Sequence, residues 1–160
     1  MSIFHQNPSG LKWSNIRFWI IWASVYFYLS LSSAMAEKKG NAALHVTILG
    51  LSSDKGNVHI ALYDNPKNFP DPDGMILDVE VPIYQKKAKY SFKGLTKKDY
   101  AIAIYHDENN NDLFDQSFFG IPLEDYAFSN NASVFLRPPS FSDASFQLYG
   151  TRYISINIAH

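Results

Sequence analysis

The sequence predicts an all-β protein, an antiparallel Greek-key β-sandwich of immunoglobulin-like or transthyretin-like type, with about seven strands and one long ordered loop. Two observations predict this class. Apolar and polar residues alternate with a period of two in short segments bounded by turn residues, which is typical of half-buried strands. Residues 37–160 show no sustained helical period, so the chain offers no helices to cover a parallel sheet. An eight-stranded barrel is the alternative way to close such strands.

The first two predicted strands are Leu44–Ile48 and Val58–Leu62. The intervening segment SSDKGN contains residues that tolerate turn geometry, so we expect these strands to form an antiparallel hairpin. Residues 65–74 are too rich in proline for regular structure and predict a loop. The later predicted strands are Leu77–Ile83, Tyr90–Phe92, Tyr100–Tyr105, Phe146–Leu148 and Ile154–Ile158.

The segment Tyr100–Tyr105 reads YAIAIY and is apolar on both faces, which predicts the central strand. Tyr100 follows a tight bend. A tyrosine in that position can turn its hydroxyl back to an upstream backbone group, as in the tyrosine corner of Greek-key sandwiches. We therefore assign Tyr100 a structural role.

The connection from Asp107 to Asp143 is far longer than most loops, and loops of that length are usually functional or disordered. Disorder is disfavoured because the segment has ample apolar surface to pack. We expect an ordered loop folded over one end or face of the sandwich. Its large apolar residues are Phe114, Phe118, Phe119, Ile121, Tyr126, Phe128, Phe135 and Phe141.

The N-terminus has the order of residues found in a secretory signal. Basic Lys12 and Arg17 precede the apolar run Phe18–Leu31, and Ala34-Met35-Ala36 supplies an A-x-A cleavage pattern. We predict that residues 1–36 are removed after Ala36. An uncleaved anchor is the alternative, although the apolar run is shorter than the roughly 20 residues of a spanning helix.

The mature chain would be one β-sandwich domain, residues 37–160, with no membrane span. Lys12 and Arg17 leave with the signal, so 12 of the 14 basic side chains and all 15 acidic ones remain, a net charge of −3. This balance, without a basic block, excludes nucleic-acid binding as an expected function. Export of a chain without cysteine is typical of a bacterial periplasmic or secreted protein.

The segment Asp107–Asp115 predicts one calcium site. Calcium takes six to eight oxygen ligands, and a coiling chain can present them from alternate residues. Asp107, Asn109, Asn111 and Asp115 stand at the first, third, fifth and ninth positions of such a loop, and the Leu113 carbonyl would be the seventh. Glu124 or Asp125 could return to complete the site.

The pattern departs from an EF-hand. Asp112 stands where glycine is expected, and Phe118 stands where a bidentate glutamate should be. The residues present are instead similar to a shorter calcium loop, the D-x-N-x-D-G-x-x-D type found outside EF-hands. The alternative is a solvated turn, because Asn and Asp also stabilise turns by hydrogen bonding to the backbone.

Other side chains give weaker indications of a catalytic or metal site. His106 is a candidate base or metal ligand at a strand end, although a histidine there is more often a packing residue. His45 and His59 fall on the polar face of the expected first hairpin, but two histidines without a third ligand make a poor zinc site. No serine lies in a G-x-S-x-G context.

Three motifs resemble the signature of an exported bacterial family catalogued as domain of unknown function 2141. They are GLxxxDYAIAIYHDENNNDLFD, then FFGIPLEDYAFSNNA, then PPSFSDASF, and they span nearly the whole mature chain. Family members usually carry Gly where this chain has Asp112. The resemblance implies an exported β-sandwich without an assigned activity. The resemblance also implies that six structural residues belong to the same assembly as the acidic run. They are Gly120, Pro122, Phe128, Asn130, Phe141 and Asp143.

We therefore expect an exported, non-enzymatic binding or adaptor module whose long loop is ordered by aromatic packing and one calcium ion. Its ligand, a small molecule or a protein, is not identified by the sequence. One alternative is a metal-assisted hydrolase that uses His106 and neighbouring carboxylates. Another is a carbohydrate-binding module that stacks Tyr126 and Phe128 on a sugar.

Overall fold

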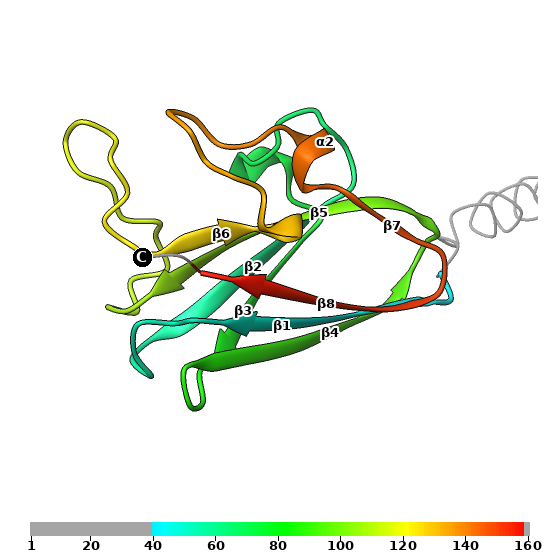
Figure 1. Ribbon diagram of the computed structural model, residues 1–160, viewed down its shortest axis with the longest axis horizontal. Helices are drawn as coiled ribbons and strands as arrows, with labels where there is room; N and C mark the ends of the chain where they lie inside the picture. The colour runs from blue at the N-terminus through cyan, green and yellow to red at the C-terminus, as the bar shows by residue number, and fades with distance from the viewer. Residues whose placement is uncertain (1–39, 159–160) are drawn as a thin grey trace, which may run out of the picture. The chain divides into compact units, whose positions relative to one another are not determined.

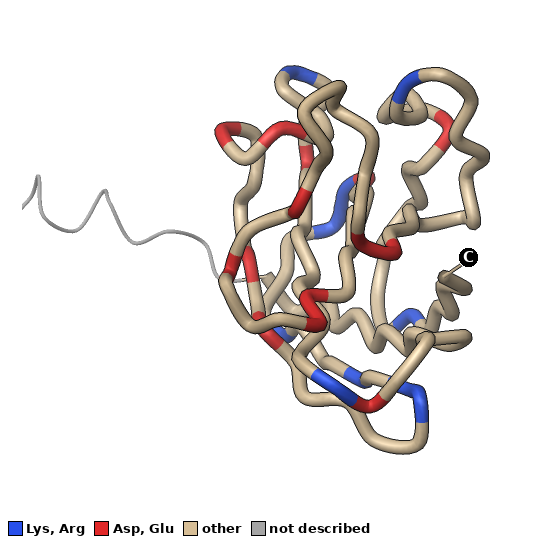
Figure 2. The backbone as a smooth tube through the Cα atoms, turned by 90° about the vertical axis from the view of Figure 1, so that its left-hand side faces the viewer, with Lys and Arg blue, Asp and Glu red and all other residues tan. Residues whose placement is uncertain are grey.

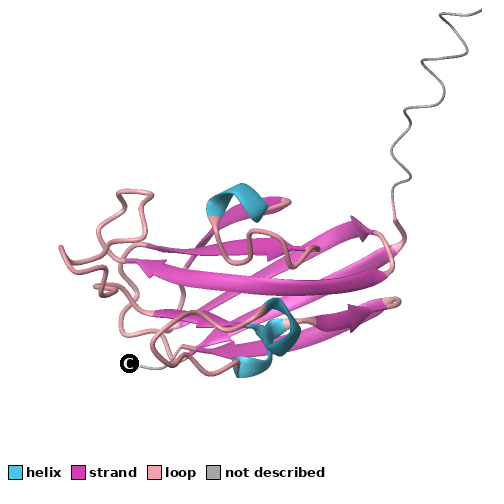
Figure 3. Cartoon of the chain, turned by 90° about the horizontal axis from the view of Figure 1, so that it is seen from above, coloured by secondary structure: helices cyan, strands magenta, loops and turns pink. Residues whose placement is uncertain are grey.

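Eight strands in residues 40–158, the part of the chain described by this computed structural model, form two sheets (Figure 1). The predicted signal segment and its cleavage site fall outside the described residues. The strands are β1 (Ala42–Leu49), β2 (Asn57–Tyr63), β3 (Leu77–Pro82), β4 (Lys87–Leu95), β5 (Lys98–Asp107), β6 (Tyr126–Phe128), β7 (Phe146–Leu148) and β8 (Thr151–Asn157). Short helical turns are η1 (Pro72–Gly74), η2 (Ser129–Asn131) and α2 (Phe141–Ala144), and they lie in the connections between strands (Figure 3).

One sheet has the order β4-β1-β8, and the other has the order β3-β2-β5-β6, with β7 also paired to β5. The pairs are antiparallel except for β1 and β8, which run parallel. Two sheets of mainly antiparallel strands confirm the predicted β-sandwich rather than the barrel.

The predicted hairpin between the first two strands is wrong. β1 pairs with β4 and β8, whereas β2 pairs with β3 and β5, so the chain crosses from one sheet to the other between them. Leu51 lies on this crossing and is buried in the core between the sheets. Turn residues allow the chain to bend, but they do not specify whether it returns along the same sheet.

Two other strands differ from expectation. The predicted short strand Tyr90–Phe92 is the middle of the nine-residue β4. β6 lies inside the segment that was expected to be a loop, and it pairs with the second half of β5. Three residues with no flanking alternation are too short to give a strand signal.

The core lies between the sheets because one set of alternating apolar side chains on each strand points inward. On β2 these are Val58, Ile60 and Leu62, and on β5 they include Ile102 and Ile104; all five are at most 3% exposed. β5 lies between β2 and β6 in its sheet, which confirms the prediction of an interior strand.

At the start of β5, the Tyr100 hydroxyl donates to the carbonyl of Thr96 at 3.0 Å. The ring itself is 1% exposed. This hydrogen bond returns across the bend between β4 and β5, and it holds the entry to the strand.

The outer face of β2 and β5 is covered by the long segment after β5 and by the proline-rich loop. A second apolar cluster packs there around Ala101, Phe128 and Ala144. Ser129 is fully buried beneath it, where its Oγ accepts from the N–H of Ile102 at 2.8 Å and donates to the carbonyl of Ala144 at 2.6 Å. The predicted ordered segment over one face of the sandwich is therefore present. Among the described residues, no helix is long and apolar enough to span a membrane.

Candidate functional site

The end of β5 lies beside the beginning of β2 because the two strands are antiparallel. Asn57 is paired with Asp107, and His59 is paired with Tyr105. Asp107 and His59 are therefore diagonal neighbours, and alternation places both side chains on the outer face of the sheet. The acidic turn folds back at this end of the outer face. Figure 2 views the molecule from that end and shows acidic positions in red on several neighbouring loops.

Asp107 is fixed at the start of the acidic turn. It is 1% exposed, its Oδ1 accepts from the N–H of Asn111 at 3.2 Å, and its Oδ2 accepts from the N–H of Asp112 at 2.8 Å. Asp112 adopts a φ of 59°. The left-handed geometry expected of glycine at this position is thus carried by aspartate, which tolerates it better than most residues do.

The other predicted ligands converge on one another. The Nδ2 of Asn109 donates to Asp115 Oδ2 at 2.7 Å, and the Nδ2 of Asn111 lies 3.2 Å from both carboxylate oxygens of Asp115. Leu113 joins the turn through its N–H, which donates to Asn111 Oδ1 at 2.9 Å. The five residues predicted to bind calcium therefore belong to one curled turn.

Glu124 returns to this turn from the long segment. Its Oε2 accepts from the N–H of Asp115 at 3.1 Å, while its Oε1 is buried and has no hydrogen-bond partner among the described residues. Burial raises the pKa of Glu124, the bond from Asp115 N–H lowers it, and the charges of Asp107 and Asp115 raise it further. The neighbouring Asp125 contributes its backbone carbonyl, which accepts from the N–H of His106 at 2.9 Å.

His59 is buried against the same turn. Its Nε2 lies 3.8 Å from Asp107 Oδ2 and 3.7 Å from Asp112 Oδ1, and its Nδ1 lies 3.8 Å from Asp78 Oδ2. Its ring stacks on that of Tyr105, with centroids 4.6 Å apart and planes inclined by 6°. Burial, and after it the charge of Asp78, raises the pKa of the Tyr105 hydroxyl.

The pairing of His59 with His45 on one hairpin face is wrong, because the two histidines belong to different sheets. His45 is on β1, where its ring stacks on Tyr153 and its Nδ1 lies 2.7 Å from Ser91 Oγ. Alternation correctly placed His59 off the core face. Its acidic neighbours depend on the pairing of β2 with β5, which no local pattern specifies.

His106 has a structural set of contacts. It is 1% exposed, its Nε2 lies 2.8 Å from the carbonyl of Lys55, and its Nδ1 lies 3.3 Å from Ser52 Oγ. A carbonyl only accepts, so Nε2 carries the proton. Glu108 accepts from Ser53 at 2.6 Å and Ser52 at 3.0 Å, and these bonds lower its pKa. The hydrogen bonds of His106 and Glu108 thus hold the turn between β1 and β2 against the end of β5.

The residues that the family resemblance grouped with the acidic run lie in two places. Gly120 adopts a φ of 74° in the tip that follows the acidic turn, and Pro122 forms a bridge to Gln116. Phe128 and Phe141 instead pack on Phe69, on the outer face farther along β5.

Asn130 and Asp143 hold that second region in place. The Nδ2 of Asn130 donates to the carbonyls of Asp143 and Ser145, at 3.2 and 2.7 Å. Asp143 forms a capping box with Ser140 at the start of α2. These residues order the long segment and lie outside the set of contacts that defines the acidic turn.

Comparisons with curated proteins and with solved structures gave no match. A family model described as "Uncharacterized protein conserved in bacteria (DUF2141)" matches residues 46–156. The match extends from β1 to β8, and it includes both the acidic turn and His59. The chain is therefore a member of DUF2141, a bacterial family without an assigned activity.

Proposed function

We propose that this protein is an exported, non-enzymatic binding module whose Asp107–Asp115 turn holds one structural calcium ion. The observation that carries the proposal is the convergence of the turn on Asp115 together with the returning Glu124. Glu124 Oε1 is buried without a hydrogen-bond partner among the described residues, and a buried acceptor without a partner costs free energy. A cation beside it would satisfy that oxygen.

Calcium suits this group of side chains. Asp107, Asp115 and Glu124 supply carboxylate oxygens, and Asn109 and Asn111 supply amide oxygens, all of which are hard ligands. Burial is the largest cause of the raised pKa of Glu124, and the charges of Asp107 and Asp115 raise it further, which reflects repulsion among these carboxylates. A divalent cation would offset that repulsion and order the segment between β5 and β6.

The contacts of His106 support a binding role over the hydrolase alternative. A general base must lie within hydrogen-bond reach of the substrate group whose proton it takes. Both ring nitrogens of His106 are directed at groups of the protein, the Lys55 carbonyl and the Ser52 hydroxyl. The side chain is also 1% exposed, so it offers substrate little access.

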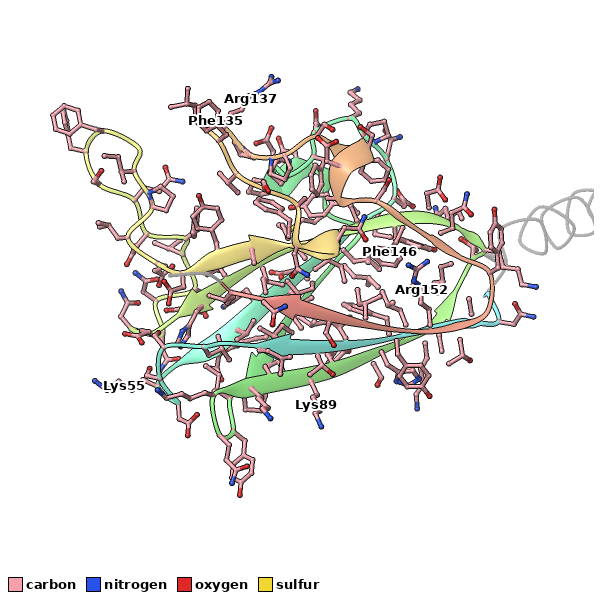
Figure 4. All side chains as sticks on the ribbon, in the orientation of Figure 1. Lys55, Lys89, Phe135, Arg137, Phe146 and Arg152 are labelled. Atoms are coloured by element: carbon pink, nitrogen blue, oxygen red, sulfur yellow. The ribbon has the colours of Figure 1, made fainter. Side chains whose placement is uncertain are left out.

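Exposed apolar side chains support the adaptor part of the proposal. Phe118 is 98% exposed and Phe119 is 84% exposed at the tip beyond the acidic turn. Phe135 is 81% exposed on the loop before α2, and Figure 4 shows it pointing away from the sheets. Apolar groups that gather on protruding loops are typical of interaction sites, so we propose that these tips contact an apolar surface of a partner.

The carbohydrate alternative receives less support from the same loops. Phe128 is 5% exposed and packs on Phe69, and Tyr126 is half-buried against Phe114. Neither ring offers the open face that stacking on a sugar requires. Export is proposed on the signal pattern of residues 1–36.

A thermal melt tests the calcium proposal. The full sequence would be expressed in a bacterium, and the exported form would be purified, stripped with chelator and melted with and without calcium. A ligand that binds only the folded state at a hundredfold excess over Kd adds about 2.7 kcal/mol. We expect the melting temperature to rise by an amount on the order of 10 °C.

The matched variants are Asp115→Asn, which should abolish the rise, and Asp73→Asn, an exposed acid in η1 that should leave it unchanged. An equal rise in all three proteins would place the calcium elsewhere. No rise in any of them would leave the turn as hydrogen bonding alone.

The double substitution Phe118→Ser/Phe119→Ser tests whether the loop tip is free of the body of the protein. Because both rings are exposed, the free energy of unfolding should change by less than about 0.5 kcal/mol in urea titrations. Binding of the apolar dye ANS to the folded protein should fall. A loss of more than about 1 kcal/mol would show that the rings pack in solution, and would remove them from the proposed contact surface.

A further inference from the structure

We propose a second metal site, formed by His59, Asp107 and Asp112, for a divalent metal of the zinc class. One side chain comes from β2, one from the end of β5 and one from the turn that follows. One ligand atom from each lies within 4.8 Å of the other two, and His59 Nε2 is 3.8 Å from Asp107 Oδ2 and 3.7 Å from Asp112 Oδ1.

The state of His59 Nε2 points to a ligand. The side chain is only 9% exposed, and Nε2 has no hydrogen-bond partner among residues 40–158. Burial of a ring nitrogen without a partner costs free energy in either tautomer, since a donor and an acceptor both lose water. The nitrogen faces two carboxylates across a gap too long for hydrogen bonding. A metal ion placed between the three groups would satisfy all of them.

The surroundings of His59 set its orientation. Asp78 Oδ2 lies 3.8 Å from Nδ1, on the far side of the ring from the proposed metal. When a metal binds Nε2, the remaining ring proton is on Nδ1, and the Asp78 carboxylate beside it would stabilise that tautomer. The stacking on Tyr105 fixes the plane of the ring. Nε2 lies 3.8 Å from Asp107 Oδ2 and 3.7 Å from Asp112 Oδ1, so a metal bound to its lone pair would be close to both carboxylates.

The two separations from Nε2 fit zinc with small movements, and the two carboxylate oxygens lie within 4.8 Å of each other. Zinc binds nitrogen and oxygen at about 2.0–2.2 Å, and a tetrahedral arrangement then separates its ligand atoms by roughly 3.4 Å. The two separations from Nε2 exceed this by a few tenths of an ångström. Asp107 is held by two backbone N–H groups, whereas the Asp112 side chain is 74% exposed and free to close. Three protein ligands leave a fourth position for water or for a group of a partner.

This site does not depend on the calcium proposal. Its nitrogen ligand suits a borderline metal, whereas the calcium turn offers oxygen alone. The sites share Asp107, but His59 belongs only to the first and Asp115 only to the second. The competing account is a protonated His59 held as an ion pair among Asp78, Asp107 and Asp112, which requires no metal.

Calorimetric titration of zinc chloride into the metal-free exported protein, prepared without a histidine tag, separates these accounts. We expect one zinc ion to bind per chain, with affinity at least a hundredfold weaker in His59→Gln. His45→Gln, on the other sheet, is the control and should bind zinc as the unmodified protein does. Asp115→Asn should also keep its zinc affinity while losing the calcium response, and His59→Gln should keep the calcium response.

Equal zinc affinity in His59→Gln and the unmodified protein would overturn the proposal, as would no binding at 100 µM zinc. If His59→Gln does not fold, nuclear magnetic resonance of the unmodified protein gives the answer. Zinc should shift the ring signals of His59 and leave those of His45 in place. Unchanged His59 signals at saturating zinc would contradict the assignment and favour the ion pair.

Discussion

Replacing Gly56 with alanine is expected to destabilise the protein by about 3 kcal/mol or more. Gly56 precedes β2 with a φ of 67°, a conformation that strains any residue with a Cβ. The added Cβ would also lie 1.8 Å from the carbonyl oxygen of Asp107 and 2.8 Å from the Cα of Glu108. Both contacts are with backbone, so no side-chain rotation can relieve them, and β2 and β5 must separate at this end.

Urea unfolding of Gly56→Ala beside Gly150→Ala measures the effect. A Cβ at Gly150 meets nothing within 4 Å, so that variant should remain within about 0.5 kcal/mol of the unmodified protein. Because the clash falls on Asp107, the folded fraction of Gly56→Ala should also lose its responses to calcium and zinc. Equal stability of the two variants would contradict the close approach of Gly56 to Asp107.

Ile102→Ala is expected to cost about 3–4 kcal/mol, within the range of isoleucine truncations in well-packed cores. Ile102 is fully buried on β5, which has a paired strand on each side, β2 and β6. The substitution leaves a cavity that neighbouring side chains, held on paired strands, can fill only in part. Against a total stability of roughly 5–15 kcal/mol, the loss is large.

Ile76→Ala is the matched control, because the same side chain is there 41% exposed. Its cost should be less than about 1 kcal/mol. Equilibrium unfolding in urea provides both values, with unchanged m-values as the check that the unfolding transition is the same. A loss below 1 kcal/mol for Ile102→Ala would mean that β5 is not at the centre of the core.

The fold class was predictable from the sequence because alternation and turn residues are local signals. Alternation found β1, β2 and β3, and the run YAIAIY, which is apolar on both faces, marked β5 as interior. The partners of each strand were not predictable in this way: the turn between β1 and β2 reads as a hairpin whether or not the chain changes sheet. Pairing is decided by the sum of contacts between distant segments, and no short segment carries that information.

The candidate site was also predictable only where its contacts are local in sequence. The curl of residues 107–115 depends on side chains that form hydrogen bonds with backbone groups a few positions away. The spacing of the Asp and Asn residues therefore predicted which residues form the turn. His59 and Asp78 come to that turn only through the pairing of β2 with β3 and β5. The sequence alone therefore assigned His59 to the wrong companion.

The aromatic residues of the long segment were expected to order it by packing, and only some of them are packed. Phe114 contacts the ring of Tyr105, and Phe128 and Phe141 contact that of Phe69. Tyr126 contacts Phe114 within the segment. Phe118 and Phe119 contact each other at an exposed tip. Composition shows that a segment has apolar surface to bury, but it does not show which part of that surface is covered.

The parallel pairing of β1 with β8 has a mechanical consequence. The two strands point in the same direction, with Ala43 beside Thr151 and Leu49 beside Asn157. A pull applied before β1 and after β8 would therefore slide one strand along the other, and their evenly spaced hydrogen bonds would share the load. Strands peeled apart from one end break their bonds one at a time. A molecule stretched between an anchor and a bound partner along this axis would resist extension through its first and last strands.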